Sequence, residues 1–511
     1  MFNDVDDDNV LDLTKIEFGS PAAERDAGLS TYFVENDAFR RVAEGNKRIL
    51  IGNRGVGKSA IFKELARRER GNPGVSVIEL APEDYSYDFF RDTMTSEQEG
   101  SWAKQSAYAA AWKYLIYVEI MKAITKDGSK TTAKNSALGR VSRHVRDNYR
   151  GGQVDKLSAL ISYLKRLEGV KIGKLEAGIK ARELQKLYKL EDLTPLLPDV
   201  QEVLRTHRVV ILVDELDKGW DESEDAKAFV AGLFRACLAV NDLSDNARLY
   251  MSLRQELYEN IPALYEDAQK VRDLTETISW DESGLKRLMA ERVRSSLGQG
   301  KSFDEKTELS VRSDDDIWSV VFAETLSYRQ NKSFNYIVDR TLYRPREVIQ
   351  FCTQSVERAV GGGSGAPIDY QTIALAEYDY SLARAQDIAA EYRFQFPELL
   401  AVFEGFRGKI FTLDRAELEL VCTEIILQER KASANLEWLD GFEAETLIEV
   451  LWRIGFLKAQ AVGGVKGQAR SGSQYLGAYQ VASLNLPTIA RFQVHPMFRS
   501  WLAMKEPKGA R

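Results

Sequence analysis

Eight consecutive residues limit the possible folds of this chain more than any other feature. They match the pattern GxxxxGK[ST], and they are Gly52, Asn53, Arg54, Gly55, Val56, Gly57, Lys58 and Ser59. Glycine lacks a Cβ, so such a loop can turn its amide N–H groups inward around a phosphate. An apolar strand at 48–51 precedes the loop, and apolar residues at helical spacing follow from Ala60. Because this pattern binds phosphate when a strand precedes it and a helix follows it, the sequence predicts a nucleotide site at 52–60.

Two side chains of this loop have different expected tasks. The Lys58 ammonium can reach the β- and γ-phosphates as a mobile positive charge, which makes it a candidate catalytic group, and the Ser59 hydroxyl is a candidate Mg²⁺ ligand. The helix after the loop presents its positive N-terminal end to the same anion. The alternative is a chance match in a glycine-containing loop, and the flanking strand and helix argue against it.

A second half of the site is expected after the apolar strand at 209–213, where Asp214 and Glu215 follow directly. We expect Asp214 to hold Mg²⁺, directly or through water, and Glu215 to activate the attacking water. A helix cap or solvated turn is the alternative for this acidic cluster, and it explains the nearby Asp217 and Trp220 nearly as well. A glutamate directly after the aspartate favours hydrolysis over transfer to a small acceptor. Since no guanine-reading NKxD motif follows, ATP is the favoured nucleotide.

The order of strands and helices predicts an α/β fold, a doubly wound P-loop NTPase sheet over 31–280. A basic helical insertion interrupts this domain at about 95–195, with one apolar stripe made by Trp112, Leu115, Ile116 and Ile120. The other predicted parts are an acidic N-terminal tail at 1–30, a helical lid at 281–360, a linker with helices at 361–410 that begins at a glycine-rich joint, and a winged-helix-like domain at 411–511.

Composition argues against several classes of protein. Three widely separated cysteines and three histidines provide too few ligands for a Cys/His metal cluster or a disulfide framework. No uncharged run reaches the roughly 20 apolar residues that a bilayer span needs, and the acidic start is unlike a signal peptide. We therefore expect a cytoplasmic protein with no membrane partner.

Positive charge is concentrated in two stretches, although the whole chain carries a net charge of −7. Residues 101–190 hold nineteen Lys or Arg against seven Asp or Glu, and 450–505 hold seven Lys or Arg and no acid. Both stretches are candidate contacts for DNA or RNA. In the second, a helix at 447–454 leads into a glycine-rich hairpin with Lys466 and Arg470, which is the order of a winged helix. The alternatives are a solvated helix face for the first stretch and a packing module or protein dock for the second.

Together these motifs resemble the additional-strand P-loop ATPases, the grouping that includes the AAA+ and STAND ATPases. Within it, the chain is most similar to a prokaryotic class often encoded beside anti-phage defence genes. Two motifs are specific, IGNRGVGKSAI at 51–61 and ILVDELDKGW at 211–220. The weaker matches sample most of the chain: Tyr32-Phe33-Val34, LRQELYENI at 253–261, YRPREVIQF at 343–351, IGFL at 454–457 and FQVHPMF at 492–498.

The resemblance implies roles for three arginines. Arg254 matches a catalytic sensor of the γ-phosphate, with Ser252 as a rival for that position. Arg344 and Arg346 match lid arginines that fold a helical subdomain over the nucleotide. The alternative is that these arginines pair with carboxylates at the domain surface.

The sequence therefore predicts a Mg²⁺-dependent ATP hydrolase that acts as a conformational switch and relays a signal to a macromolecular partner, such as an effector protein. The resemblance adds a role in prokaryotic anti-phage defence. The alternative is a nucleic-acid-binding sensor that uses ATP mainly for assembly, with little turnover, and a phosphotransferase is a weaker one. Both a monomer and a homo-oligomer are compatible with this prediction.

Overall fold

The chain divides into two compact units in the computed structural model. The model describes residues 11–80, 101–126, 135–149, 193–214, 216, 222–261, 272–427, 436–461, 474–481 and 483–507. The sheet unit is Glu35–Ile278, and the helical unit combines Met1–Val34 with Ser279–Arg511. Each unit has its own core of buried apolar side chains.

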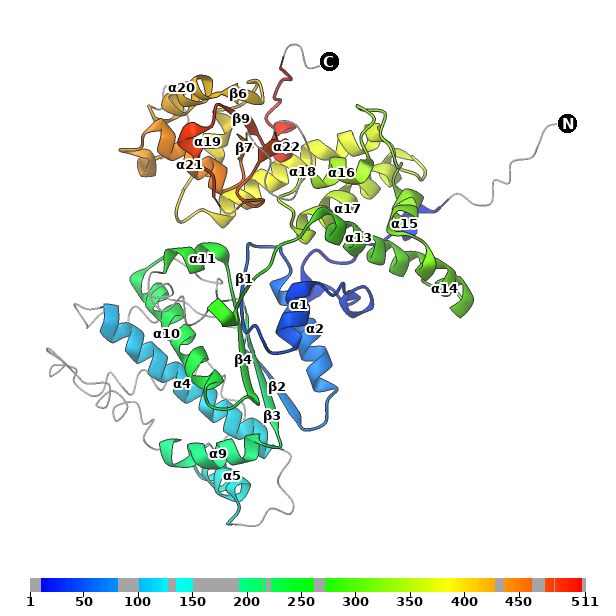
Figure 1. Ribbon diagram of the computed structural model, residues 1–511. Helices are drawn as coiled ribbons and strands as arrows, with labels where there is room; N and C mark the ends of the chain where they lie inside the picture. Colours follow the sequence, from blue (N-terminus) through cyan, green and yellow to red (C-terminus); the bar gives the residue numbers. More distant parts are fainter. Residues whose placement is uncertain are drawn as a thin grey trace. The chain divides into compact units, whose positions relative to one another are not determined.

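A five-stranded parallel sheet forms the centre of the sheet unit (Figure 1). Its strands are β1 (Ile49–Ile51), β2 (Val75–Leu80), β3 (Arg208–Val213), β4 (Ala247–Leu253) and β5 (Thr275–Thr277), in the order β2-β3-β4-β1-β5. Strand β4 therefore lies between β1, which precedes the glycine-rich loop, and β3, which precedes Asp214. A parallel sheet with this additional strand confirms the predicted α/β P-loop fold.

Helices cover both faces of this sheet, as expected for the continuous apolar run at 209–213 in β3, which is buried throughout. They are α1 (Asp37–Ala43), α2 (Lys58–Arg70), α4 (Ser101–Thr125), α5 (Ala137–Asn148), α9 (Leu197–Leu204), α10 (Glu224–Asn241) and α11 (Gln255–Asn260). In Figure 1, α1 and α2 lie on one face of the sheet, and α4 and α10 lie on the other.

The predicted apolar stripe of the basic insertion belongs to the core of the sheet unit. Its four members lie on α4 and are all buried: Trp112, Leu115, Ile116 and Ile120. The Trp112 ring lies 5.1 Å from that of Phe229 on α10. Gly232 of α10 permits this close packing, because a Cβ there would lie 2.5 Å from the Cβ of Tyr108 on α4. The first part of the insertion therefore supports the sheet.

The helical unit begins with helices and ends with a small antiparallel sheet. Its helices before the sheet are α13 (Glu282–Leu297), α14 (Phe303–Val311), α15 (Asp314–Val321), α16 (Ser333–Val338), α17 (Pro345–Gly362), α18 (Tyr370–Glu391) and α19 (Leu399–Glu404). There follow β6 (Thr412–Asp414), α20 (Arg415–Ile426), α21 (Ala444–Arg453), β7 (Leu457–Ala461), β8 (Gln474–Leu476), β9 (Arg491–Val494) and α22 (Pro496–Arg499). Within the described residues, no helix combines the length and apolar character needed to cross a bilayer.

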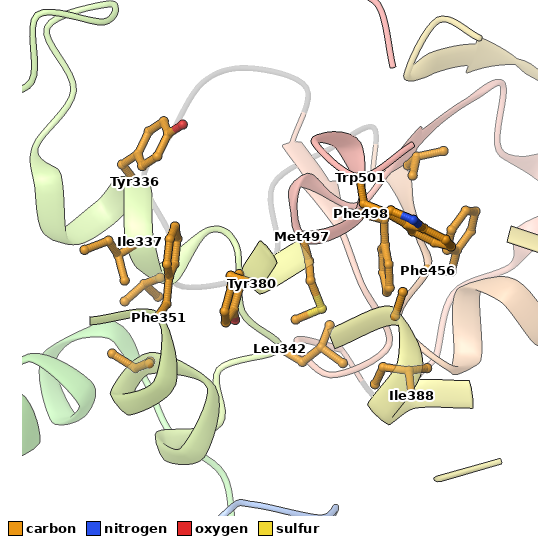
Figure 2. Close-up of a cluster of buried hydrophobic side chains, with 14 of the residues drawn as sticks. Tyr336, Ile337, Leu342, Phe351, Tyr380, Ile388, Phe456, Met497, Phe498 and Trp501 are labelled. Atoms are coloured by element: carbon orange, nitrogen blue, oxygen red, sulfur yellow. The ribbon is translucent and has the colours of Figure 1, made fainter. Parts of the chain in front are cut away.

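The C-terminal elements have the order of a winged helix, as the sequence predicts. The sheet order is β6-β9-β7-β8, and α20 and α21 precede the β7–β8 hairpin. Figure 2 shows that one buried cluster joins this part to the preceding helices. Phe351 of α17 stacks on Tyr380 of α18 at 4.3 Å, and Phe456 lies 4.9 Å from Phe498 of α22. The winged helix therefore shares a core with α16 to α18.

The glycine-rich segment at 361–365 differs from the flexible joint that we expected. Helix α17 continues through Gly362, and Gly363 ends it with a φ of 69°, a left-handed conformation that glycine adopts without strain. Helix α18 then packs against α17 through the Phe351–Tyr380 stack. Gly361 and Gly362 therefore belong to α17, residues 363–369 connect it to α18, and α18 is part of the core instead of a linker.

The described part of the N-terminal segment also differs from the tail that we expected. Leu13, Ile16 and Phe18 are buried in the core of the helical unit. Arg292 of α13 donates to the carbonyl oxygen of Phe18 and, at 3.2 Å, to the carboxylate of Asp26. The acidic composition of the segment concealed these few apolar residues, which are spaced too irregularly to reveal a helix or strand.

Candidate nucleotide-binding site

The register of the parallel sheet brings the motif strands to one edge. Strand β1 ends at Ile51, which is aligned with Leu253 of β4. Asp214 lies one residue beyond the last residue of β3, at the level of Ser252 in β4. The carboxyl ends of parallel strands form the usual ligand-binding edge of an open α/β sheet. The glycine-rich loop and the first acidic residue therefore meet where a nucleotide site is expected.

The loop contains two residues in the left-handed region. Gly55 and Gly57 have φ values of 83° and 102°, which are unfavourable for residues with a Cβ. Helix α2 starts directly after Gly57, so Lys58, Ser59 and Ala60 make its first turn. Amide groups in a first turn have no partner within the helix and favour an anion at that end. The loop and helix together fit a phosphate group.

The Lys58 side chain folds back onto the loop. The Lys58 ammonium donates to the carbonyl oxygens of Gly52, at 2.6 Å, and Asn53, at 3.1 Å. Val56 is buried, whereas Arg54 is exposed. Phosphate oxygens carry more negative charge than these carbonyls, so the ammonium can exchange them for a phosphate held by the loop.

Asp214 is held by a buried hydroxyl. Ser252 donates a hydrogen bond to Oδ1 of Asp214, and only 3% of Ser252 is exposed. The bond fixes the orientation of the carboxylate at the sheet edge. Carboxylate and hydroxyl oxygens are ligands that Mg²⁺ accepts, so Asp214 and Ser59 have the chemistry that a magnesium site requires.

The structure places the two rival sensor residues differently. Ser252 contacts Asp214, as described above, whereas Arg254 precedes α11 and lies 3.4 Å from the carboxylate of Glu256. The sequence offers Ser252 only as a rival, and the contact emerges from the alignment of β3 with β4. The expected general base, Glu215, lies outside the described residues, as do Asp217 and Trp220.

The two expected lid arginines belong to the helical unit. Arg344 is buried, and its guanidinium lies 2.8 Å from Glu391 and 3.7 Å from Glu347. Arg346 donates to the carbonyl oxygen of Pro21 at 3.3 Å. Arg344 thus has the carboxylate partners of the alternative interpretation, although those partners lie inside the unit and not at its surface.

The basic stretch at 101–190 places three exposed arginines on α5. Arg140 forms a two-pronged ion pair with Asp199 of α9, and this hydrogen bond lowers the pKa of Asp199. Arg143 and Arg146 are exposed. Residues 150–192 lie outside the described residues. Arg146 also lies 3.5 Å from the carboxylate of Asp147. Since Arg140 is held by Asp199, the described part offers Arg143 and Arg146 as candidate phosphate contacts on one helix.

The basic stretch at 450–505 presents a different surface from the one expected. The exposed side chains of α21 include Glu445 and Glu449, and Arg453 is the exposed cation at its end. Burial lowers the pKa of Lys458, as expected for a side chain turned inward. The hairpin residues Lys466 and Arg470 lie outside the described residues. Because phosphates repel carboxylates, α21 is poorly suited to enter a DNA groove.

Comparisons with known proteins add three findings. Residues 283–389, from α13 into α18, match the family described as FunZ-associated C-terminal helical domain. A putative transposon gamma-delta 80.3 kDa protein of Escherichia coli (strain K12) is 22% identical over 503 residues, which cover 96% of this chain and 67% of that protein. The Aeropyrum pernix ORC1 protein in complex with DNA gives a TM-score of 0.36 at 12% identity, covering 95% of this chain and 96% of that chain. The ORC2 protein of the same organism gives 0.33 at 10% identity, covering 94% and 91%.

Two features of the sheet unit identify its fold, the strand order and the loop between β1 and α2. These two features define the sheet unit as an α/β P-loop domain.

Proposed function

We propose that this protein is a Mg²⁺-dependent ATP-binding and ATP-hydrolysing switch. The observation that supports this most directly is the Ser252–Asp214 hydrogen bond, at the sheet edge where the loop at 52–59 opens. A solvated acidic turn gives no reason for a buried hydroxyl to orient the carboxylate. A metal site does, because a bound ion needs its ligands held in place.

In this proposal each residue of the edge has one task. The loop amides and the Lys58 ammonium bind the phosphates, and Ser59 and Asp214 hold Mg²⁺. When bound, Mg²⁺ neutralises charge on the phosphates. Glu215 accepts the proton of the attacking water. Arg254 is retained as a proposed sensor of the γ-phosphate, beside Ser252.

The signal is proposed to pass between the two units. The chain crosses between them twice, and Ile278, the last residue of the sheet unit, donates its amide to Ile51 directly before the loop. We retain Arg344 and Arg346 as proposed lid arginines on the strength of the family resemblance. If Arg344 exchanged its carboxylates, and Arg346 its carbonyl oxygen, for phosphate oxygens, the nucleotide state would be coupled to the helical unit.

The macromolecular partner is proposed to be DNA or RNA, with an effector protein receiving the output, in a cytoplasmic defence role. Among the described parts of the two basic stretches, the exposed Arg143 and Arg146 suit a phosphate backbone better than the acidic face of α21 does. The Escherichia coli relative is named as a transposon protein, so duplex DNA is the first partner to test. Assembly into a homo-oligomer is part of the same proposal.

ATP binding and phosphate release, measured with and without DNA or RNA, test this function. The switch ATPase requires phosphate release that depends on Mg²⁺. A protein that binds ATP and assembles, but releases almost no phosphate in any of these samples, would instead be the nucleic-acid sensor. The exposed Arg143 and Arg146 of α5 favour this second function, because a nucleic-acid sensor needs cations that contact phosphates. Transfer of the label from ATP to an acceptor other than water would contradict both.

A further inference from the structure

A turn at residues 325–332 of the helical unit contains an unusual pair of backbone conformations. Thr325 and Lys332 pair across it in an antiparallel bridge. At its tip, Arg329 and Gln330 have φ values of 57° and 54°. Two consecutive positive φ values are the requirement of a type I′ turn, which Asn-Gly satisfies without strain. Arg and Gln both have a Cβ, so the fold retains them there at a conformational cost.

The side chains at this tip are polar and exposed. They are Arg329, Gln330, Asn331 and Lys332. Arginine, glutamine and asparagine are the residues that most often pair with base edges in the major groove, and arginine and lysine contact phosphates. A strained backbone that presents these side chains to solvent indicates a function in binding rather than in folding.

Two side chains of the turn already hold an anion. The Tyr328 hydroxyl, at 2.7 Å, and the Arg329 guanidinium, at 2.8 Å, both donate to the same oxygen, Oε1 of Glu506. The Tyr328 ring stacks on Tyr370 at 5.0 Å, and the Arg329 guanidinium lies 5.2 Å from the Tyr328 ring centre. The hydrogen bond from Tyr328, together with the positive charge of Arg329, lowers the pKa of Glu506. The pair is therefore built to receive a negatively charged oxygen.

The charge around this pair suits a phosphodiester better than it suits a single carboxylate. Lys332 and Lys505 are exposed nearby in the chain, and Arg499 adds positive charge near Glu506. Residues 325–332 contain no acid, and the exposed Glu324 directly precedes the turn.

We propose that the 325–332 turn contacts duplex DNA, with Tyr328 and Arg329 donating to a backbone phosphate that displaces Glu506. Gln330 and Asn331 then face the groove. The turn itself lies outside both basic stretches, although Arg499 and Lys505 beside it belong to the second, and it does not depend on the ATP site. Glu506 acts as an internal competitor, because its carboxylate occupies the same donors.

The test replaces the tip with the sequence that the turn prefers. In the double variant R329N/Q330G, strain is relieved, so the melting temperature should stay the same or rise, while affinity for a labelled 30-base-pair duplex should fall about tenfold. The slope of log affinity against log salt should fall by about one. E506Q should bind the duplex more tightly than the parent. Matched controls are K301N, which removes an exposed cation paired with Glu305, and E357Q, which removes an exposed carboxylate.

Titrations use the full chain, with and without Mg²⁺ and ATP. The proposal is supported if R329N/Q330G lowers and E506Q raises the affinity for the duplex, and if K301N and E357Q change that affinity by less than about twofold. The proposal is overturned if the parent does not bind duplex DNA, or if R329N/Q330G binds it as the parent does. It is also overturned if affinity falls only for single strands, RNA or polyglutamate. ATP hydrolysis is measured on the same samples, so a failure of the ATPase proposal is seen separately.

Discussion

Replacing Ser252 by alanine should impair ATP hydrolysis by a calculable amount. The substitution removes the hydroxyl that donates to Oδ1 of Asp214 and leaves that carboxylate without this orienting partner. Hydrogen bonds to charged groups contribute about 1.5–3 kcal/mol, and about 1.4 kcal/mol corresponds to a factor of ten in rate. If the bond persists in the hydrolytic complex, S252A should lower kcat/KM about 10- to 150-fold. The apparent requirement for Mg²⁺ should rise at the same time, because Asp214 holds the ion.

The assay is phosphate release at a series of Mg²⁺ concentrations, with ATP binding measured separately. The matched control is Ser76→Ala in the same sheet, which removes a hydroxyl that lies 2.9 Å from Nε2 of His207 and is hydrogen-bonded to it. Ser76 is the second residue of β2 and lies at the opposite end from the carboxyl edge. The S76A protein should therefore hydrolyse ATP normally. An S252A protein with the parent's rate and Mg²⁺ response, or equal losses in both variants, would refute the assignment of the edge.

Three further predictions follow from the described contacts. Arg292→Met removes the cation that pairs with the buried carboxylate of Asp26, which keeps its hydrogen bond from Tyr32. The substitution should lower the free energy of unfolding of the helical unit by about 3–5 kcal/mol. In urea denaturation, R358M, which breaks the exposed pair with Asp379, should lower it by at most about 1 kcal/mol. His495 is fully buried, and burial, with the nearby cations, lowers its pKa below the ordinary 6.5. Below about pH 6.5 the unfolded chain then binds more protons than the folded chain. The stability that neutral His495 contributes is therefore present above that pH and is lost on acidification by up to about 1.4 kcal/mol per pH unit. H495Q should flatten the plot of unfolding free energy against pH between about pH 7.5 and about pH 5, and an unchanged slope of that plot would assign the effect to other groups. Gly57→Ala places a Cβ at a φ of 102° and should weaken ATP binding about tenfold, whereas Gly300→Ala, also left-handed at 71°, should leave ATP binding unchanged in an equilibrium titration.

The parts of the fold that the sequence predicts correctly are those with strong local signals. The strand at 209–213 is continuously apolar, and the loop from Gly52 combines glycines with a lysine at fixed spacing. Such signals fix the element and the neighbourhood, because a parallel sheet brings its carboxyl ends together. The partner of Asp214 needed the register of β3 against β4, which is a tertiary property. The sequence therefore leaves Ser252 and Arg254 as rivals.

The parts that the sequence predicts poorly depend on packing between distant segments. Leu13 and Ile16 lie in an acidic context, and only their packing into the core of the helical unit, where residues 13–15 contact α17, shows that they are core residues. The glycines at 361–365 have the composition of a joint, but one of them caps a helix whose neighbour packs back on it. The 325–332 turn has no glycine or proline to mark it. Its positive φ values are set by the surrounding structure and not by local preference.

The most direct test of the proposed ATP site is phosphate release by Glu215→Gln, measured together with its ATP binding and compared with Lys58→Ala. Glu215→Gln should bind ATP as the parent does and release phosphate at least about a hundredfold more slowly, because the amide cannot accept the proton of water. Lys58→Ala should lose ATP binding. A Glu215→Gln protein that releases phosphate at the parent's rate, or a Lys58→Ala protein that binds ATP normally, would contradict the proposed site.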